Sequence, residues 1–188
     1  KRNGYKLHLD GARLHLASAF TGISPLEYAS YFDTVYMSLY KYLNASGGAM
    51  LCGDADIIDK MSHQIKILGG TTYQTWNQTA MALHYLEGIE ERWKKVTRKT
   101  DQLINALNKI DEVRITKVKN GTNIYTLALS ENVDITKCGR ILYQSNKIFL
   151  GRASENGSVR LTINESLLNR DISNLISAFK TAITDAKK

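Results

Sequence analysis

Two stretches of this 188-residue chain decide its fold: His8-Leu9-Asp10-Gly11-Ala12-Arg13 and, further along, Ser38-Leu39-Tyr40-Lys41-Tyr42-Leu43-Asn44. The first overlaps an apolar run at Tyr5–Leu9, which predicts a buried strand. The second overlaps the run Asp33–Leu39, whose β-branched and aromatic residues predict another strand. Each predicted strand therefore leads directly to a charged side chain, a carboxylate in the first case and a lysine in the second.

The carboxylate of Asp10 and the amine of Lys41 together predict a site for pyridoxal 5′-phosphate. A buried carboxylate can hold the cationic nitrogen of a pyridine ring, and a lysine that ends a nearby strand can form an imine with an aldehyde. Taken alone, an Asp-Gly pair is more often a turn, and an arginine in a strand is more often a surface residue. The order and spacing of these residues carry the prediction.

The chain separates into three predicted regions. Residues 1–73 alternate between strand and helix patterns, and residues 74–111 form a long helical connection, which we expect to kink near Gly88. Residues 112–188 form a small α+β domain, in which Asn120-Gly121 predicts a hairpin turn between two strands. Further predicted elements are helices over 54–68, 134–144 and 168–186 and strands over 148–150 and 159–163.

Composition and charge argue against several classes of protein. With 43% hydrophobic and 23% charged residues, the chain is typical of soluble globular proteins, and it has no apolar stretch of the roughly 20 residues that a membrane span needs. The net charge is +7, but the basic cluster Arg92–Lys99 follows several glutamates on a predicted helix, so we expect no nucleic-acid binding. Cys52 and Cys138, the only cysteines, form neither a disulfide framework nor a metal site, which favours a reducing, cytoplasmic location.

The ordered motifs resemble the threonine aldolase and β-eliminating lyase family of pyridoxal-phosphate fold type I. That family carries a His-x-Asp-Gly-Ala-Arg-Leu segment, a strand with the Schiff-base lysine, a Gly-Gly-Gly-Met-Arg-Gln loop, the first strand of a small domain, and a strand with a carboxylate-binding arginine. The stretches that resemble them are, in the same order, His8–Leu14, Asp33–Leu43, Leu68–Gly70 with Gln74, Thr122–Ile124 and Val159–Thr162.

The resemblance implies the fold class of this chain and the absence of the N-terminal half of the enzyme from it. The fold class would be α/β, with the C-terminal part of a fold type I PLP-dependent transferase large domain followed by a small α+β C-terminal domain. The first predicted strand has no earlier strand to pair with, so we expect this chain to be the C-terminal half of such an enzyme and to need the N-terminal half of the same protein. The resemblance also implies a homo-oligomer, because active sites in this family lie at subunit boundaries.

The resemblance implies a role for each matching residue. Asp10 would accept the proton of the pyridine nitrogen and keep the ring cationic, and Lys41 would form the Schiff base that the substrate amine displaces. Arg13 would lie near the ring oxygen and the substrate carboxylate. Arg160 would clamp the substrate carboxylate by two-point hydrogen bonding, with Arg152 as its rival for that role. Weaker candidates for cofactor contacts are Ser38, His8 and the loop Gly69-Gly70-Thr71.

Several residues depart from the family's pattern. Tyr40 replaces a small hydroxyl residue before the lysine, Tyr42 and Asn44 replace glycines after it, and Ser46 stands where a proline is common. In the glycine-rich loop, Thr71-Thr72-Tyr73 replaces Gly-Met-Arg, so an arginine that helps to hold the phosphate in the family is absent. The side chains around the expected imine are therefore larger than those usual for the family.

The expected activity is that of a PLP-dependent lyase of the threonine aldolase type, which cleaves a β-hydroxy amino acid substrate to glycine and an aldehyde. We expect little or no activity from this chain by itself. Two alternatives remain open: another reaction of the same cofactor (β-elimination, racemisation or transamination) and a non-catalytic descendant that retains the fold. A third, the basic nucleic-acid binder discounted above, would require DNA binding that depends steeply on salt.

Overall fold

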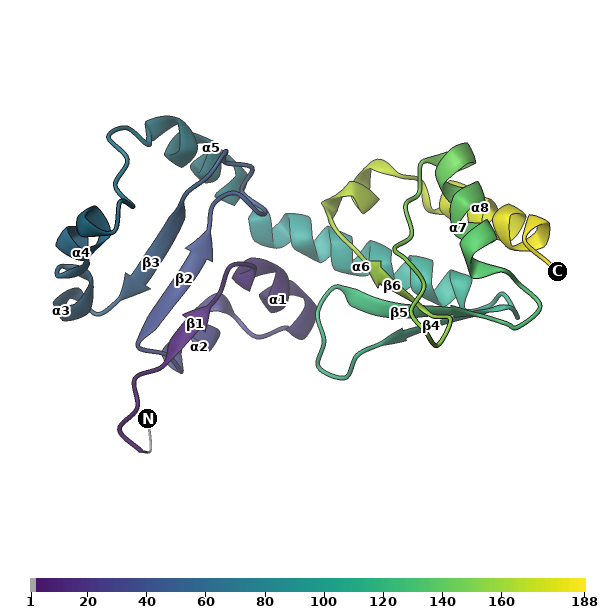
Figure 1. The fold of residues 1–188 in the computed structure, drawn as a ribbon, viewed down its shortest axis with the longest axis horizontal. Coiled ribbons are helices and arrows are strands. Elements are labelled where there is room, and N and C mark those ends of the chain that lie inside the picture. Colours follow the sequence, from purple (N-terminus) through teal and green to yellow (C-terminus); the bar gives the residue numbers. More distant parts are fainter. Residues whose placement is uncertain (1–2) are drawn as a thin grey trace. The chain divides into compact units, whose positions relative to one another are not determined.

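The computed structural model describes residues 3–188, which divide into two compact units between Glu91 and Arg92. Each unit contains one three-stranded sheet together with helices. Figure 1 follows the chain from the strands of the first unit, in purple and blue, to the helices of the second, in green and yellow. No helix among these residues is long and apolar enough to cross a membrane. The domain boundaries expected at residues 73 and 111 stay a prediction.

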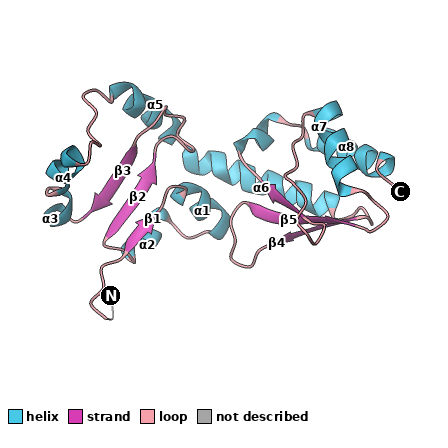
Figure 2. Ribbon diagram, viewed as in Figure 1, coloured by secondary structure: helices cyan, strands magenta, loops and turns pink. Residues whose placement is uncertain are grey.

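The first unit has a sheet with the strand order β1-β2-β3. β1 (His8–Asp10) and β2 (Thr34–Ser38) run parallel, and β3 (Ala49–Gly53) pairs antiparallel with β2 (Figure 2). Parallel strands need a crossover connection, which two helices supply here. The helices of this unit are α1 (Leu14–Thr21), α2 (Pro25–Ser30), α3 (Ala55–Ile58), α4 (Met61–Ile67) and α5 (Trp76–Leu86).

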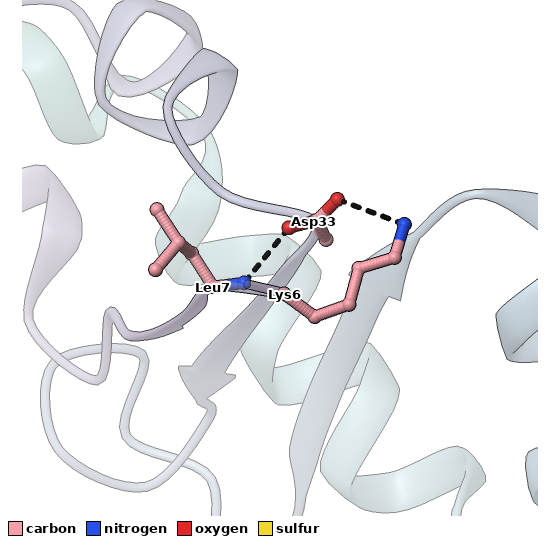
Figure 3. A network of polar contacts seen from close by, with 3 residues as sticks. All are labelled: Lys6, Leu7 and Asp33. Atoms are coloured by element: carbon pink, nitrogen blue, oxygen red, sulfur yellow. Dashed lines mark hydrogen bonds and ion pairs between the residues drawn. The ribbon is translucent and has the colours of Figure 1, made fainter. Parts of the chain in front are cut away.

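Asp33 determines where the pairing of β1 begins. Its Oδ2 accepts a hydrogen bond of 2.8 Å from the backbone N–H of Leu7, and its Oδ1 lies 3.3 Å from Lys6 Nζ (Figure 3). The backbone N–H of Leu7 is thereby used by a side chain, and the ladder with β2 starts one residue later, at His8. The predicted strand is therefore shorter at its N-terminal end than the apolar run from Tyr5 indicated.

The second unit has an antiparallel sheet with the strand order β4-β5-β6. Its strands are β4 (Val113–Lys117), β5 (Ile124–Leu129) and β6 (Val159–Thr162). The turn expected at Asn120-Gly121 lies between β4 and β5, and Asn120 has the positive φ of 57° that such turns favour. The helices are α6 (Ile89–Leu107), which spans the boundary between the units, α7 (Ile135–Asn146), the 3-10 helix η1 (Glu165–Asn169) and α8 (Ile172–Asp185).

One row of apolar side chains crosses the second sheet. Ile115, Leu127 and Val159 are paired in register on adjacent strands, and all three are buried. Their sequence neighbours Arg114 and Arg160 point to the opposite face and are exposed, because successive side chains of a strand alternate between the two faces. Leu127, at the centre of this row, is completely buried.

Replacement of Leu127 by alanine is therefore expected to lower the free energy of unfolding by about 2–5 kcal/mol, because it removes buried methyl groups and leaves a cavity. Urea denaturation of the longest polypeptide that carries this sequence measures the effect, with intrinsic fluorescence as the probe. The matched control is Thr116→Ala, an exposed position on the neighbouring strand. Equal losses in the two variants would contradict the placement of Leu127 in the core.

Asp171 is the N-cap of α8. Its carboxylate accepts hydrogen bonds from the backbone N–H groups of Ser173 at 2.8 Å and Asn174 at 3.3 Å. A hydrogen bond from the Ser173 hydroxyl is the largest of the effects that lower the pKa of Asp171, followed by those two backbone bonds. The ionised cap therefore stabilises the fold above the ordinary pKa of an aspartate.

Replacement of Asp171 by alanine is expected to lower the melting temperature by a few degrees at neutral pH. Because the folded-state pKa is lowered, the contribution is present above the unfolded pKa and is lost as the pH falls through the folded value. Melting curves of wild type and variant should therefore converge in acid. Asp185→Ala, at the last residue of the same helix, is the control and is not expected to destabilise the protein.

Helix boundaries follow local signals in the sequence. Ser24 caps α2 through a 3.1 Å hydrogen bond from the backbone N–H of Glu27, and Pro25 occupies the first turn, as predicted. The helical region expected from residue 74 to 110 is divided into α5 and α6 at Gly88, whose φ of +66° ends the first helix at the predicted position. The helix expected over 54–68 is also divided, into α3 and α4.

The strand predicted over 148–150 is wrong. After α7 the chain turns at Lys147, which has a left-handed φ of 55°, and the next residues form no strand. The position beside Val159 is instead taken by Ala153, through an isolated antiparallel bridge. Leu150 is still buried, so its apolar character reflects packing against the core and not pairing in a sheet.

Candidate active site

The carboxyl ends of β1 and β2 lie at the same edge of the first sheet, because these two strands are parallel. Asp10 is the last residue of β1, and Lys41 follows the end of β2 by three residues. Ser38, which is buried, ties the two ends together, since its hydroxyl donates a 3.0 Å hydrogen bond to the carbonyl oxygen of Ala12. In α/β sheets, ligands bind outside the carboxyl ends of parallel strands.

Asp10 presents one carboxylate oxygen for binding. Its Oδ1 accepts a 3.2 Å hydrogen bond from the backbone N–H of Ala12, while Oδ2 has no hydrogen-bond partner among residues 3–188, and the side chain is exposed. Gly11 makes this turn possible, because a Cβ at that position would lie 2.9 Å from the carbonyl oxygen of Tyr36. The Asp-Gly pair is thus a turn, and it also leaves the carboxylate open at the sheet edge.

Lys41 lies in the connection between β2 and β3 and is half-buried. Its Nζ lies 5.6 Å from the centroid of the Tyr40 ring. The interaction with the neighbouring Tyr40 hydroxyl is the largest of the effects that raise the pKa of Tyr36, with smaller contributions from burial and from the charges of Tyr40 and Asp10. Tyr36 is paired in register with Asp10, and the four residues Asp10, Tyr36, Tyr40 and Lys41 are called here the Asp10–Lys41 group.

Two other predicted residues lie on either side of Asp10 in the sequence, Arg13 after it and His8 at the amino end of β1. Arg13 is exposed directly before α1, with its guanidinium carbon 5.8 Å from the centroid of the Tyr42 ring. His8 lies at the start of β1, where its Nδ1 is 2.9 Å from Thr34 Oγ1 on β2. His8 is therefore engaged in a contact between the strands, whereas Arg13 extends from the turn that follows Asp10.

The loop Gly69-Gly70-Thr71 lies after α4 and is exposed. Gly69 has a positive φ of 73° that ends the helix, and the N–H of Gly70 donates a 2.9 Å hydrogen bond to the carbonyl oxygen of Ile65. Within the described part of the chain, no hydrogen bond or ion pair joins this loop to the Asp10–Lys41 group. The glycines thus have a local structural role at the helix end.

Arg160 belongs to the second unit. It is exposed on β6, paired in register with Thr126, and lines a cavity of about 580 Å³ together with Phe149, Ser166 and Arg170. Its rival Arg152 is also exposed, in the loop before β6, and lines a different cavity of about 390 Å³. Of the two, Arg160 is held by a regular strand, which restricts the directions that its side chain can take.

The residues at the edge of the first sheet fit pyridoxal 5′-phosphate. An open carboxylate oxygen and a lysine amine stand at adjacent strand ends, which is the donor set that a cationic pyridine and an aldehyde require. Residues 3–188 contain no cluster of His, Cys, Asp or Glu that could hold a metal ion. The sequence analysis missed Tyr36, which could have been found from its place in the strand that leads to Lys41.

This fold belongs to the α/β class, in which ligands bind at the carboxyl ends of parallel strands. The sequence profile of the beta-eliminating lyase family matches residues 1–130. The chain therefore belongs to the beta-eliminating lyase family, as its motifs indicated.

Several relatives are similar to this chain. The low-specificity L-threonine aldolase of Candida albicans is 47% identical over 87 residues, which cover 46% of this chain and 23% of that protein. Low-specificity L-threonine aldolase 1 of Arabidopsis thaliana is 29% identical over 185 residues, which cover 97% of this chain and 51% of the relative. Alanine racemase TOXG of Cochliobolus carbonum is 43% identical over 83 residues, or 44% of this chain and 21% of the relative.

A solved structure shows the same fold. A protein of Listeria monocytogenes described as an L-allo-threonine aldolase superposes with a TM-score of 0.78 at 22% identity, over 98% of this chain and 53% of that chain. The predicted α/β fold of the PLP-dependent fold type I class is thus confirmed. The chain spans about half the length of the relatives that it matches throughout.

Proposed function

We propose that the polypeptide carrying this chain is a pyridoxal-phosphate enzyme of the threonine aldolase type. It would cleave the Cα–Cβ bond of a β-hydroxy amino acid and release glycine and an aldehyde. The observation that carries this proposal is the Asp10 carboxylate, with its open Oδ2, at the same sheet edge as Lys41. The threonine aldolases among the relatives support the choice of reaction.

The bound cofactor would supply an electron sink for the bond that breaks. Asp10 would hold the pyridine nitrogen in its protonated form through Oδ2, while the N–H of Ala12 keeps the carboxylate oriented through Oδ1. Lys41 would hold the cofactor aldehyde through Nζ. Ser38 would keep the two strand ends at a constant separation through its bond to the Ala12 carbonyl oxygen.

The substrate carboxylate would be held by arginines. Arg13 lies at the turn after Asp10, with the face of Tyr42 beside its guanidinium group. Arg160 offers a planar guanidinium group from a strand of the second unit, and such a group can donate two parallel hydrogen bonds to one carboxylate. The role of these arginines would be to orient the substrate, while the cofactor supplies the electron sink.

The remaining groups would come from a longer polypeptide. Proton removal from the β-hydroxyl needs a base, and the cofactor phosphate needs a set of hydrogen-bond donors. We expect both from the part of the protein that corresponds to the other half of the relatives, and we expect a homo-oligomer. For this reason the experiment uses the longest polypeptide that carries this sequence, and residues 1–188 alone are expected to show little or no turnover.

The test combines that polypeptide with pyridoxal phosphate and a panel of β-hydroxy amino acids, including both threonine diastereomers and an aromatic analogue. The expected result is a new absorbance band of the protein-bound cofactor, together with equal amounts of glycine and aldehyde. Absence of the band would refute the cofactor assignment. A band without any glycine release would refute the aldolase reaction while leaving the cofactor assignment intact.

A second candidate reaction is the racemisation of a small amino acid. It is favoured by the 43% identity with an alanine racemase and by Tyr40 and Tyr42, whose bulk on either side of Lys41 is unusual for the family. Incubation of the cofactor-loaded protein with L-alanine, followed by chiral chromatography, separates the two candidates. Formation of D-alanine without release of glycine from any β-hydroxy amino acid would favour the racemase.

A further inference from the structure

The cavity of about 580 Å³ in the second unit lies beside the outer strand of its sheet. One wall is the segment after α7, which includes Phe149, and another is the stretch from β6 through η1, which includes Arg160. Apart from a single bridge at Val159, the outer side of β6 pairs with no strand among the described residues. Arg160 and Leu161, which point to opposite faces of the sheet, therefore both line the cavity at this edge. The volume lies within the range of about 300–1,000 Å³ that is usual for small-molecule sites.

The charged side chains of this cavity are all cationic. Its lining includes Lys147, Arg160 and Arg170, and no acidic side chain of the described residues lines it. The side chains of Arg160 and Arg170 are exposed, and neither forms a hydrogen bond, ion pair or ring contact with any residue in the range 3–188. Two unpaired guanidinium groups beside one cavity favour an anionic ligand, because such a ligand can accept hydrogen bonds from both.

The acidic residues that flank this region in the sequence are already engaged elsewhere. In η1, Glu165 Oε1 lies 3.3 Å from Arg92 Nε, and the Asp171 carboxylate caps α8. The amine of Lys99 donates a hydrogen bond to the carbonyl oxygen of Arg170, which holds the backbone from which that side chain extends. The backbone of Arg170 is thus fixed, while its guanidinium group is available to a ligand.

The rest of the lining is largely apolar. Leu103 and Leu107 of α6 and Phe179 of α8 are buried, whereas Phe149 is 78% exposed. The Phe149 ring meets the Tyr143 ring edge-on, with their centroids 6.3 Å apart. An exposed aromatic ring in the same cavity as two unpaired guanidinium groups suits a ligand that has an anionic end and an apolar body.

We propose that this cavity binds a small organic carboxylate with an apolar body. Arg160 and Arg170 would donate hydrogen bonds to the carboxylate, and Phe149 would pack against the apolar body. Binding at this cavity needs neither the cofactor nor turnover, so the inference goes beyond the proposed function. The carboxylate would belong either to the amino acid substrate, for which Arg160 is the expected clamp, or to a separate effector.

The first experiment measures the binding of 3-phenylpropanoate to the longest polypeptide that carries this sequence, by calorimetric titration without added pyridoxal phosphate. Saturable binding is expected. The alcohol 3-phenylpropan-1-ol, which has the same apolar body without the charge, should bind about tenfold more weakly, or weaker still. Acetate, which has the charge without the body, should also bind more weakly than 3-phenylpropanoate.

Two variants test the residues that would hold this ligand. Arg170→Gln should raise the dissociation constant by about tenfold to a hundredfold, the range for a lost hydrogen bond to a charged group. Phe149→Ala should raise it by about threefold to tenfold, because it removes an apolar contact. The matched controls are Arg114→Gln and Val118→Ala, at exposed residues of the same unit that do not line this cavity, and both should bind like wild type.

Three results would overturn the inference: no saturable binding of 3-phenylpropanoate to wild type, wild-type affinity in Arg170→Gln, or equal affinity of wild type for the carboxylate and the alcohol. Melting temperatures of all variants are recorded, so that a loss of affinity can be separated from a loss of stability. If a variant is unstable, the comparison of the carboxylate with the alcohol on wild type still decides.

A second experiment identifies the source of the carboxylate. It adds 3-phenylpropanoate to the cofactor-loaded polypeptide during turnover of a β-hydroxy amino acid. A higher KM at unchanged kcat would assign the cavity to the substrate, whereas a changed kcat would assign it to a separate effector. Absence of a cofactor band would refute the proposed function, and the calorimetric titration would still decide this inference.

Discussion

Replacement of Lys41 by alanine is expected to abolish the absorbance band of the lysine-bound cofactor and to reduce turnover by about a thousandfold or more. The reason is chemical: the amine is the nucleophile that forms the covalent link with the aldehyde, and alanine has no group that can replace it. The position favours this role, because Lys41 follows the end of β2 at the same sheet edge as the open oxygen of Asp10.

The Lys41→Ala variant should fold normally, since its Nζ contacts an aromatic ring at the surface and is not part of the core. The melting temperature should therefore stay close to that of wild type. Lys60→Ala, at an exposed lysine before α4 in the same unit, is the matched control and should keep both the band and the turnover. An unchanged band in Lys41→Ala would show that another lysine binds the cofactor.

Replacement of Asp10 by asparagine is expected to reduce turnover by about a hundredfold to a thousandfold, the range for loss of one preorganised electrostatic contact. Asparagine has nearly the same shape, and its carbonyl oxygen can still accept the bond from Ala12 N–H, so the turn at Gly11 should persist. What is lost is the negative charge that keeps the pyridine nitrogen protonated, and with it the capacity of the ring to accept electrons.

The Asp10→Asn variant should lose turnover while it still binds the cofactor, and it therefore distinguishes cofactor binding from catalysis. Lys41 is intact, so a cofactor band is still expected, although with weaker affinity and an altered spectrum. Asp56→Asn, at an exposed carboxylate in α3, is the control and should leave turnover unchanged. Full turnover in Asp10→Asn would contradict the assignment of this carboxylate to the pyridine nitrogen and would require a different carboxylate in that role.

Much of the fold could be predicted because its signals are local. Ser24-Pro25 marks the start of α2, Asn120-Gly121 the turn between β4 and β5, and Gly88 the break between α5 and α6. Each of these signals acts on its own backbone within a few residues. The prediction was wrong at residues 148–150, where the role of an apolar run depends on distant partners. These residues form no strand, and their apolar character reflects the burial of Leu150.

The candidate site could likewise be predicted only in part: its residue types followed from the sequence, but its geometry did not. The order of Asp10, Arg13 and Lys41 in the sequence was sufficient to predict the cofactor class, because the chemistry of an electron sink and an imine requires those residue types. Their geometry could not be predicted, since it depends on the parallel register that pairs Asp10 with Tyr36. A shift of one residue in that register would turn the Tyr36 side chain to the other face of the sheet.

By itself, then, the sequence determined the family, most of the helices and strands, and the residue types of the site, because these are carried by local patterns and ordered motifs. The tertiary structure alone decided that Asp10 keeps one oxygen open, that Ser38 joins the two strand ends, and that Tyr36 is paired with Asp10 across β1 and β2. The physical reason is that hydrogen bonds and ring contacts depend on distances between residues far apart in the chain, which only the packing of β1 against β2 establishes.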